Sequence, residues 1–219
     1  MSIRENLAAV EQRIAAACAR AKRNRSEVTL IAVSKTFPAA MVDEAIAAGI
    51  AEIGENRVQE AREKKPAVQR SARWHLVGHL QSNKAKDAVG LFEMIQTVDS
   101  VNLAEKIARA AEGAGKTQDV LLQVNIGDEA QKSGATSAEL EVLARDVRRI
   151  GALRVRGLMA LPPVSSLEEM RNHFKQLRSM RDALGLEELS MGMSDDFEMA
   201  IEEGSTMVRI GRAIFGSRG

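Results

Sequence analysis

Lys35 lies directly after a short apolar run, VTLIAVS at residues 28–34, and its position suits covalent chemistry. A lysine amine that is partly removed from water loses its proton more readily and then attacks carbonyl carbons. The product of such an attack is a Schiff base. The simpler alternative is that Lys35 is a solvated loop residue, but the strongly apolar segment before it favours a reactive amine at the mouth of a buried sheet.

Two segments near the end of the chain have the residue types that bind phosphate. After the apolar run 188–193, Ser194 is placed to cap a helix beginning at Asp195, which would leave backbone N–H groups available to an anion. The carboxylates of Asp195 and Asp196 suit a helix N-terminus but would repel a phosphate that faced them. Gly211 lacks a side chain and lets an anion approach the backbone. Alternatively, Ser194 only caps a helix and Gly211 only ends a strand.

Arg209 is a charged residue inside an apolar segment, MVRIGR. A buried charge requires a partner. Residues two apart in a strand point to the same side, so Arg209 is expected to face the same cavity as Gly211. Pairing of Arg209 with a glutamate such as Glu55 is the alternative, and the two arrangements are compatible.

The elements that must position these residues alternate in type along the chain. Apolar, β-branched runs alternate with helical patterns such as 138–150 and 166–184, which predicts a parallel sheet. Eight such runs within about 200 residues favour a closed (β/α)8 TIM barrel. The predicted strands are 28–33, 51–56, 74–79, 94–98, 119–126, 153–161, 188–193 and 207–211.

A further helix is expected at the start of the chain. Ser2 and Glu5 form a capping-box pattern, and an apolar stripe continues to about Asn24. This extra helix would cover the bottom or the flank of the barrel. No Pro/Gly/Ser-rich linker divides the sequence, so we expect one domain over residues 1–219.

Active sites of such barrels form at the carboxyl ends of the strands. The residues at or just after the carboxyl ends of the predicted strands are therefore expected to converge. They are Ser34, Lys35, Glu55, Asn56, Arg57, His79, Gln81, Asn125, Met159, Met193, Ser194, Gly211 and Arg212.

Composition argues against several classes of partner. The 31 Lys and Arg residues nearly balance 30 Asp and Glu residues, whereas nucleic-acid and membrane-surface proteins carry a basic excess. Cys18 is the lone cysteine and the three histidines are scattered, so neither an internal disulfide nor a zinc site is expected. The N-terminal segment has charges throughout, and no apolar stretch is long enough to span a bilayer. These features favour a cytoplasmic protein.

Six motifs are spread over essentially the whole chain. They are IAVSKT around Lys35, GENRVQE at 54–60, WHLVGHLQSNK at 74–84, QVNIGDEAQKSG at 123–134, RGLMALPP at 156–163 and SMGMSDDFEMAIEEGSTMVRIGRAIFG at 190–216. Together they resemble the YggS/PROSC family of proteins that bind pyridoxal 5′-phosphate (PLP), also called pyridoxal phosphate homeostasis proteins. The fold of that family is similar to the N-terminal barrel of alanine racemase.

The resemblance implies a role for each residue of a PLP site. It implies a Schiff base on Lys35, with Arg209 near the pyridine nitrogen and Asn56 beside the ring. The implied phosphate contacts are Ser194, the backbone of Gly211 and Arg212, and, less directly, Ser190.

Two residues depart from the family pattern. His79 stands where the W-H-x-x-G-x-L-Q motif is expected to have proline, and Arg212 replaces a small hydroxylated residue. The first change affects a loop. The second exchanges a hydroxyl contact to phosphate for a guanidinium contact or loses the contact. Lys132 offers a second amine for PLP, or is a plain loop lysine.

The expected function is PLP homeostasis, in which the protein holds the cofactor and supplies it to apo-enzymes that use PLP. Racemases with an arginine at the pyridine nitrogen use a second base, a tyrosine that a second domain and a partner subunit deliver. We expect neither that second domain nor such a base here, because the sequence contains no tyrosine. We therefore expect no efficient amino-acid turnover, and a monomer or weak dimer. Two alternatives are a small PLP-dependent racemase or lyase that uses His79 as a base, and an aldolase-type barrel in which Lys35 attacks a sugar carbonyl.

Overall fold

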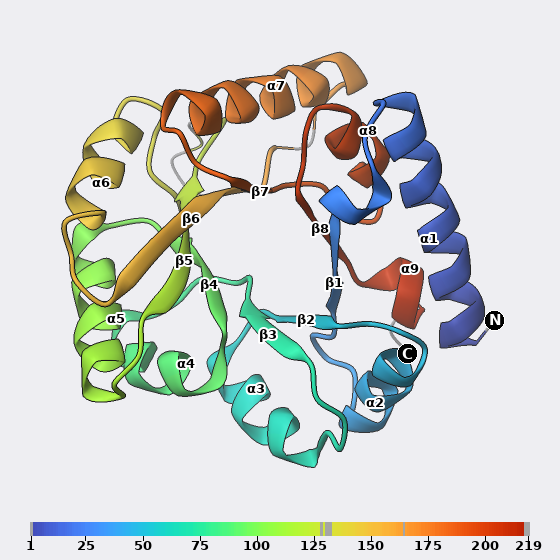
Figure 1. Ribbon diagram of the computed structural model, residues 1–219, viewed down its shortest axis with the longest axis horizontal. Helices are drawn as coiled ribbons and strands as arrows, with labels where there is room; N and C mark the ends of the chain where they lie inside the picture. The colour runs from blue at the N-terminus through green and yellow to red at the C-terminus, as the bar shows by residue number, and fades with distance from the viewer. Residues whose placement is uncertain (1, 128, 130–132, 164, 217–219) are drawn as a thin grey trace.

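Eight parallel strands close into a barrel in the computed structural model, which describes residues 2–127, 129, 133–163 and 165–216 (Figure 1). The strands follow one another in chain order, and β8 pairs with β1 to close the sheet. All eight predicted strands and the TIM-barrel fold are confirmed. Their bounds are β1 Thr29–Val33, β2 Glu52–Glu55, β3 Arg73–Leu76, β4 Met94–Val98, β5 Gln118–Val124, β6 Leu153–Ala160, β7 Glu188–Ser190 and β8 Met207–Ile210.

The helices form a ring around the barrel (Figure 1). None of those in the described part of the chain is long and apolar enough to cross a membrane. The predicted helices 138–150 and 166–184 are present as the shorter α6 and α7. The bounds are α1 Ile3–Arg20, α2 Ala39–Ala47, α3 Val58–Lys64, α4 Ala85–Leu91, α5 Val101–Gly113, α6 Leu140–Val147, α7 Leu167–Ala183, α8 Phe197–Glu202 and α9 Arg212–Phe215, with 3-10 turns at Arg25–Glu27, Lys65–Ala67 and Ser82–Lys84.

Helix α1 is the predicted extra helix, and it lies on the flank of the barrel against α8 and α9 (Figure 1). Its capping box is formed, because Ser2 Oγ accepts from the Glu5 backbone N–H at 3.3 Å and Glu5 accepts from the Ser2 backbone N–H at 2.8 Å. The helix ends at Arg20 rather than near Asn24, since Lys22 adopts a left-handed conformation with φ of 54°.

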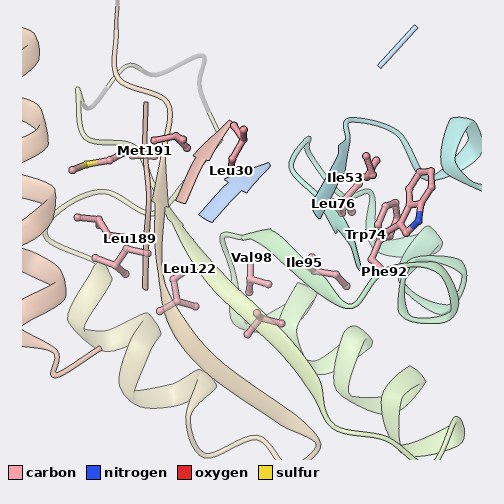
Figure 2. Close-up of a cluster of buried hydrophobic side chains, with 14 of the residues drawn as sticks. Leu30, Ile53, Trp74, Leu76, Phe92, Ile95, Val98, Leu122, Leu189 and Met191 are labelled. Carbon is pink, nitrogen blue, oxygen red and sulfur yellow. The ribbon is translucent and has the colours of Figure 1, made fainter. Parts of the chain in front are cut away.

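Alternating residues of the strands face outward and pack under the helices. Figure 2 shows this outer layer, which includes Leu30, Ile53, Trp74, Leu122 and Leu189, all buried. Because successive side chains in a strand point to opposite faces, their neighbours line the barrel interior. There, a separate apolar cluster is formed by Ile31, Met94, Leu121, Met159 and Met207.

The position of Met159 corrects one sequence prediction. This residue was expected at the mouth of the barrel, but it is fully buried in the internal cluster. Strand β6 extends to Ala160, and Leu161 is therefore the residue that reaches the mouth.

Candidate functional site

A cavity of about 290 Å³ lies at the carboxyl ends of the strands. It brings together six of the seven residues predicted for the site, from segments as far apart in sequence as Lys35 and Arg212. Its lining residues are Val33, Lys35, Phe37, Asn56, Val77, Leu161, Met193, Ser194, Asp195, Arg209, Gly211 and Arg212. The predicted convergence of Lys35, Asn56, Ser194, Arg209, Gly211 and Arg212 is therefore present, whereas their roles remain predictions.

Lys35 occupies a tight turn that follows β1. The Phe37 N–H donates to the Ser34 carbonyl at 3.0 Å, and Thr36 has a positive φ of 69°. The Phe37 ring stacks on Phe215 of α9 with 5.0 Å between ring centroids. This contact holds the turn with the lysine beside the segment that follows β8.

Arg209 is buried in the inner wall of the cavity, with 4% of its surface exposed. Its Nη1 donates to Ser190 Oγ at 2.6 Å and its Nη2 to the Ala160 carbonyl at 2.9 Å. Burial lowers the pKa of the guanidinium to about 10, and the nearby charge of Asp196 opposes this shift. Arg209 therefore remains positively charged at neutral pH.

The alternative pairing of Arg209 with Glu55 is wrong. The Glu55 carboxylate instead accepts hydrogen bonds from Ser34 Oγ at 2.6 Å and from Lys64 Nζ at 2.5 Å. Burial raises the pKa of Glu55, while the hydrogen bonds from Lys64 and Ser34 lower it. Glu55 has the outward parity of Ile53, whereas Arg209 has the inward parity of Met207, so the two side chains lie on opposite faces of the sheet. Arg209 therefore takes neutral partners from β7 and β6.

Ser190 lies beneath the cavity and takes part in a hydrogen-bonded chain that runs through the barrel. Its hydroxyl donates to Gln96 Oε1 at 2.7 Å, and Gln96 Nε2 lies 3.0 Å from His75 Nδ1. His75 Nε2 in turn lies 2.6 Å from the Glu52 carboxylate. Since Gln96 Oε1 is an acceptor, Gln96 Nε2 donates to His75, which assigns the remaining His75 proton to the Glu52 contact. Ser190 is fully buried and does not line the cavity, so the chain orients Arg209.

We expect Ser190→Ala to lower the free energy of unfolding by about 2–4 kcal/mol, because it leaves Arg209 Nη1 and Gln96 Oε1 without their partner. Urea denaturation measures this loss. Ser179→Ala, on the exposed side of α7, is the matched control and should change stability by less than about 0.5 kcal/mol. Equal losses in the two variants would contradict a role for the chain in holding Arg209.

The segment after β7 differs from the prediction in its helix start. Helix α8 begins at Phe197, not at Asp195, and Ser194 does not cap it. The reason is a turn at 193–196, in which the Asp196 carboxylate accepts from the Met193 N–H at 2.6 Å. Ser194 is thus left on the wall of the cavity.

The segment after β8 turns at Gly211 directly into the short helix α9. A Cβ at Gly211 would lie 3.1 Å from the Val33 carbonyl, so the close approach of β1 and β8 favours glycine. N–H groups of a first helical turn have no partner within the helix, which suits them to an anion. The Arg212 guanidinium lies 2.8 Å from the Asp195 carboxylate, and this pair offsets the charge that would repel a phosphate.

His79 and Asn125 lie in the barrel mouth but in a neighbouring cavity of about 330 Å³. The His79 side chain is 55% exposed, and its Nδ1 lies 3.3 Å from Ser133 Oγ. Asn56 lines both cavities. Gln81 and Arg57 line a third cavity beside them. Lys132, the second candidate amine, lies outside the described residues.

Sequence reasoning missed the apolar wall of the cavity, formed by Val33, Phe37, Val77 and Leu161. The residues predicted at the strand ends are mainly polar, so these apolar residues were not among them. The alternation of side chains along a strand could have identified Val33, because Val33 lies two residues before Lys35 and points to the same side. The same rule could have identified Leu161, because it ends the predicted strand 153–161 and lies two residues after Met159.

The fold and the cavity together define a (β/α)8-barrel protein with a lysine, a buried arginine and a glycine turn at the carboxyl end of the barrel. Residues 3–219 match the family described as alanine racemase, N-terminal domain. The chain is 43% identical over 221 residues to the pyridoxal phosphate homeostasis protein of Pseudomonas aeruginosa, covering 99% of this chain and 96% of that one. It is also 43% identical over 228 residues to the Escherichia coli K12 protein of the same name, with coverage of 99% and 97%. The chain belongs to the family of pyridoxal phosphate homeostasis proteins.

Solved structures agree with this assignment. PipY of Synechococcus elongatus, solved with PLP bound, is 38% identical with a TM-score of 0.85 and covers 98% of this chain and 100% of that chain. Alanine racemase of Clostridium difficile has a TM-score of 0.76 at 15% identity and shows the fold alone. This chain covers 57% of that racemase.

Proposed function

We propose that the protein binds PLP in the cavity at the carboxyl end of the barrel and holds it as a Schiff base on Lys35. The observation that carries this proposal is the shared cavity of Lys35, Arg209, Ser194 and Gly211, which sets an amine beside groups suited to an anion. PLP supplies an aldehyde that condenses with a lysine amine, with loss of one water molecule, and a phosphate that requires a cradle.

Each polar residue of the cavity has a chemical role in this proposal. Ser194, the Gly211 backbone and Arg212 bind the phosphate, and Asn56 contacts the ring. Arg209 lies beside the pyridine nitrogen, where its positive charge disfavours protonation of that nitrogen. Ser190 acts through Arg209 rather than by binding phosphate, because its hydroxyl already bonds Arg209 and Gln96.

We further propose that the protein holds and supplies PLP rather than converting amino acids. The names of the Pseudomonas and Escherichia relatives support a role in PLP homeostasis. The acceptors in this proposal are apo-enzymes that use PLP, and the compartment is the cytoplasm. Few large apolar side chains are exposed among the described residues, and this supports a monomer or weak dimer. They are Val142, Leu161, Leu167 and Met193.

The test is a visible absorption spectrum of the purified protein after incubation with PLP and removal of free cofactor. We expect the yellow absorption of a Schiff base, retained through desalting. Pyridoxal, which has the aldehyde but no phosphate, should be retained at least about tenfold less well. A colourless protein would exclude the PLP proposal and favour the aldolase-type alternative, whereas equal retention of the two compounds would exclude the phosphate assignments.

A further inference from the structure

The turn that carries Lys35 is held from both sides by side chains of α3. On the side before the lysine, Lys64 Nζ donates to the Ser34 carbonyl at 2.7 Å. On the side after it, the Thr36 backbone N–H donates to the Glu60 carboxylate. Lys64 and Glu60 are one turn apart on α3 and bond each other at 2.9 Å. The two peptide groups that flank Lys35 are thus joined through one ion pair.

The lysine of this ion pair is buried, whereas the Glu60 side chain is 25% exposed. The Lys64 side chain is 7% exposed and also contacts Glu55, whose side chain is fully buried, at 2.5 Å. Glu55 in turn accepts from Ser34 Oγ, so β2 supports the same turn. A buried charge with several hydrogen bonds has a fixed geometry, because each lost contact leaves a charged group unsatisfied.

The turn needs such support because its backbone is strained. Thr36 has a φ of 69°, in the left-handed region that β-branched residues rarely occupy. An isolated turn of this sequence would relax toward negative φ and would redirect the lysine side chain. The Glu60 carboxylate stabilises the strained form by accepting from the Thr36 N–H.

We propose that Glu60 and Lys64 are positioning residues that hold the Lys35 amine in the direction required for Schiff-base formation. This inference rests on the proposed function and adds a group of residues outside the cavity, since neither side chain lines it. In this proposal Glu60 and Lys64 affect formation of the covalent bond, whereas the residues of the cavity bind the phosphate and the ring.

Two ligands separate this role from a general structural one. PLP has the aldehyde that Lys35 attacks, whereas pyridoxine 5′-phosphate has an alcohol at that position and cannot form a Schiff base. For Glu60→Ala we expect PLP affinity to fall by about tenfold and the affinity for pyridoxine 5′-phosphate to stay within about twofold of wild type. Glu60→Gln keeps an acceptor for the Thr36 N–H and should recover part of the PLP affinity.

Glu63→Ala is the matched control, because Glu63 is exposed on the same helix. Lys64→Met is a poorer variant, since it leaves Glu55 buried without its cation and threatens folding. Thermal unfolding of the apo-protein verifies that Glu60→Ala is folded. Unchanged PLP affinity in Glu60→Ala, or an equal loss for both ligands, would overturn the positioning role. If the wild-type protein itself forms no reducible adduct on Lys35, the proposed function fails first.

Discussion

Replacing Lys35 with alanine should abolish the covalent adduct between the protein and PLP. Among the described residues, Lys35 is the lysine that lines the cavity together with Arg209, Ser194 and Gly211, whereas Lys84 lines a different cavity. Borohydride reduction converts a Schiff base into a stable amine, and peptide mapping then locates the pyridoxyl group. We expect stoichiometric labelling of wild type on the peptide that contains Lys35, and none in the variant.

The same variant should retain weak binding of the cofactor through its phosphate. The phosphate contacts proposed at Ser194 and Gly211 do not involve the lysine, so affinity should fall by at least about tenfold without vanishing. Lys84→Ala is the matched control and should label as wild type does. Label found mainly on Lys84 or Lys132 in the wild-type protein would refute the assignment of Lys35.

The PLP-loaded protein should interconvert the enantiomers of alanine negligibly. Racemisation requires a proton-transfer group on each face of the substrate, and each positioned group contributes about 10²–10⁴-fold. The sequence contains no tyrosine. His79, the remaining candidate base, is half exposed and lines a neighbouring cavity rather than the one that contains Lys35. In the proposed site, the Arg209 charge beside the pyridine nitrogen would further weaken the ring as an electron acceptor.

Incubation with L-alanine in deuterated water tests this expectation. Slow exchange of the α-proton with retention of configuration is compatible with a single base, whereas deuterated D-alanine should form at least about 10²-fold more slowly than that exchange. Free PLP at the same concentration is the control. Rapid formation of deuterated D-alanine that is lost in Lys35→Ala would establish an enzyme and contradict the carrier proposal. If loss of His79 alone removed that activity, the histidine would be the second base.

Local sequence determined the elements and the kind of chemistry they carry. The strands are short, mainly apolar runs, and β1, β4 and β8 are rich in β-branched residues. These signals lie within a few residues of one another, so they are readable without the fold. The Ser2–Glu5 capping box of α1 is equally local, and it formed as predicted. The sequence predicts Lys35 at the cavity because Lys35 follows the carboxyl end of a strand, and these ends form the active-site face of such barrels.

Tertiary structure alone decided which partners the buried groups take. Arg209 bonds Ser190 and Ala160 rather than Glu55, and Met159 is enclosed because β6 runs one residue past it. These outcomes depend on strand register and strand length, which are set by contacts between residues far apart in sequence. The contacts of Glu60 and Lys64 with the turn of Lys35 also join residues far apart in sequence. The i,i+4 spacing of the two residues predicts an ion pair on one helix, but only the packing of α3 against β2, the strand beside β1, brings that pair to the backbone of the lysine.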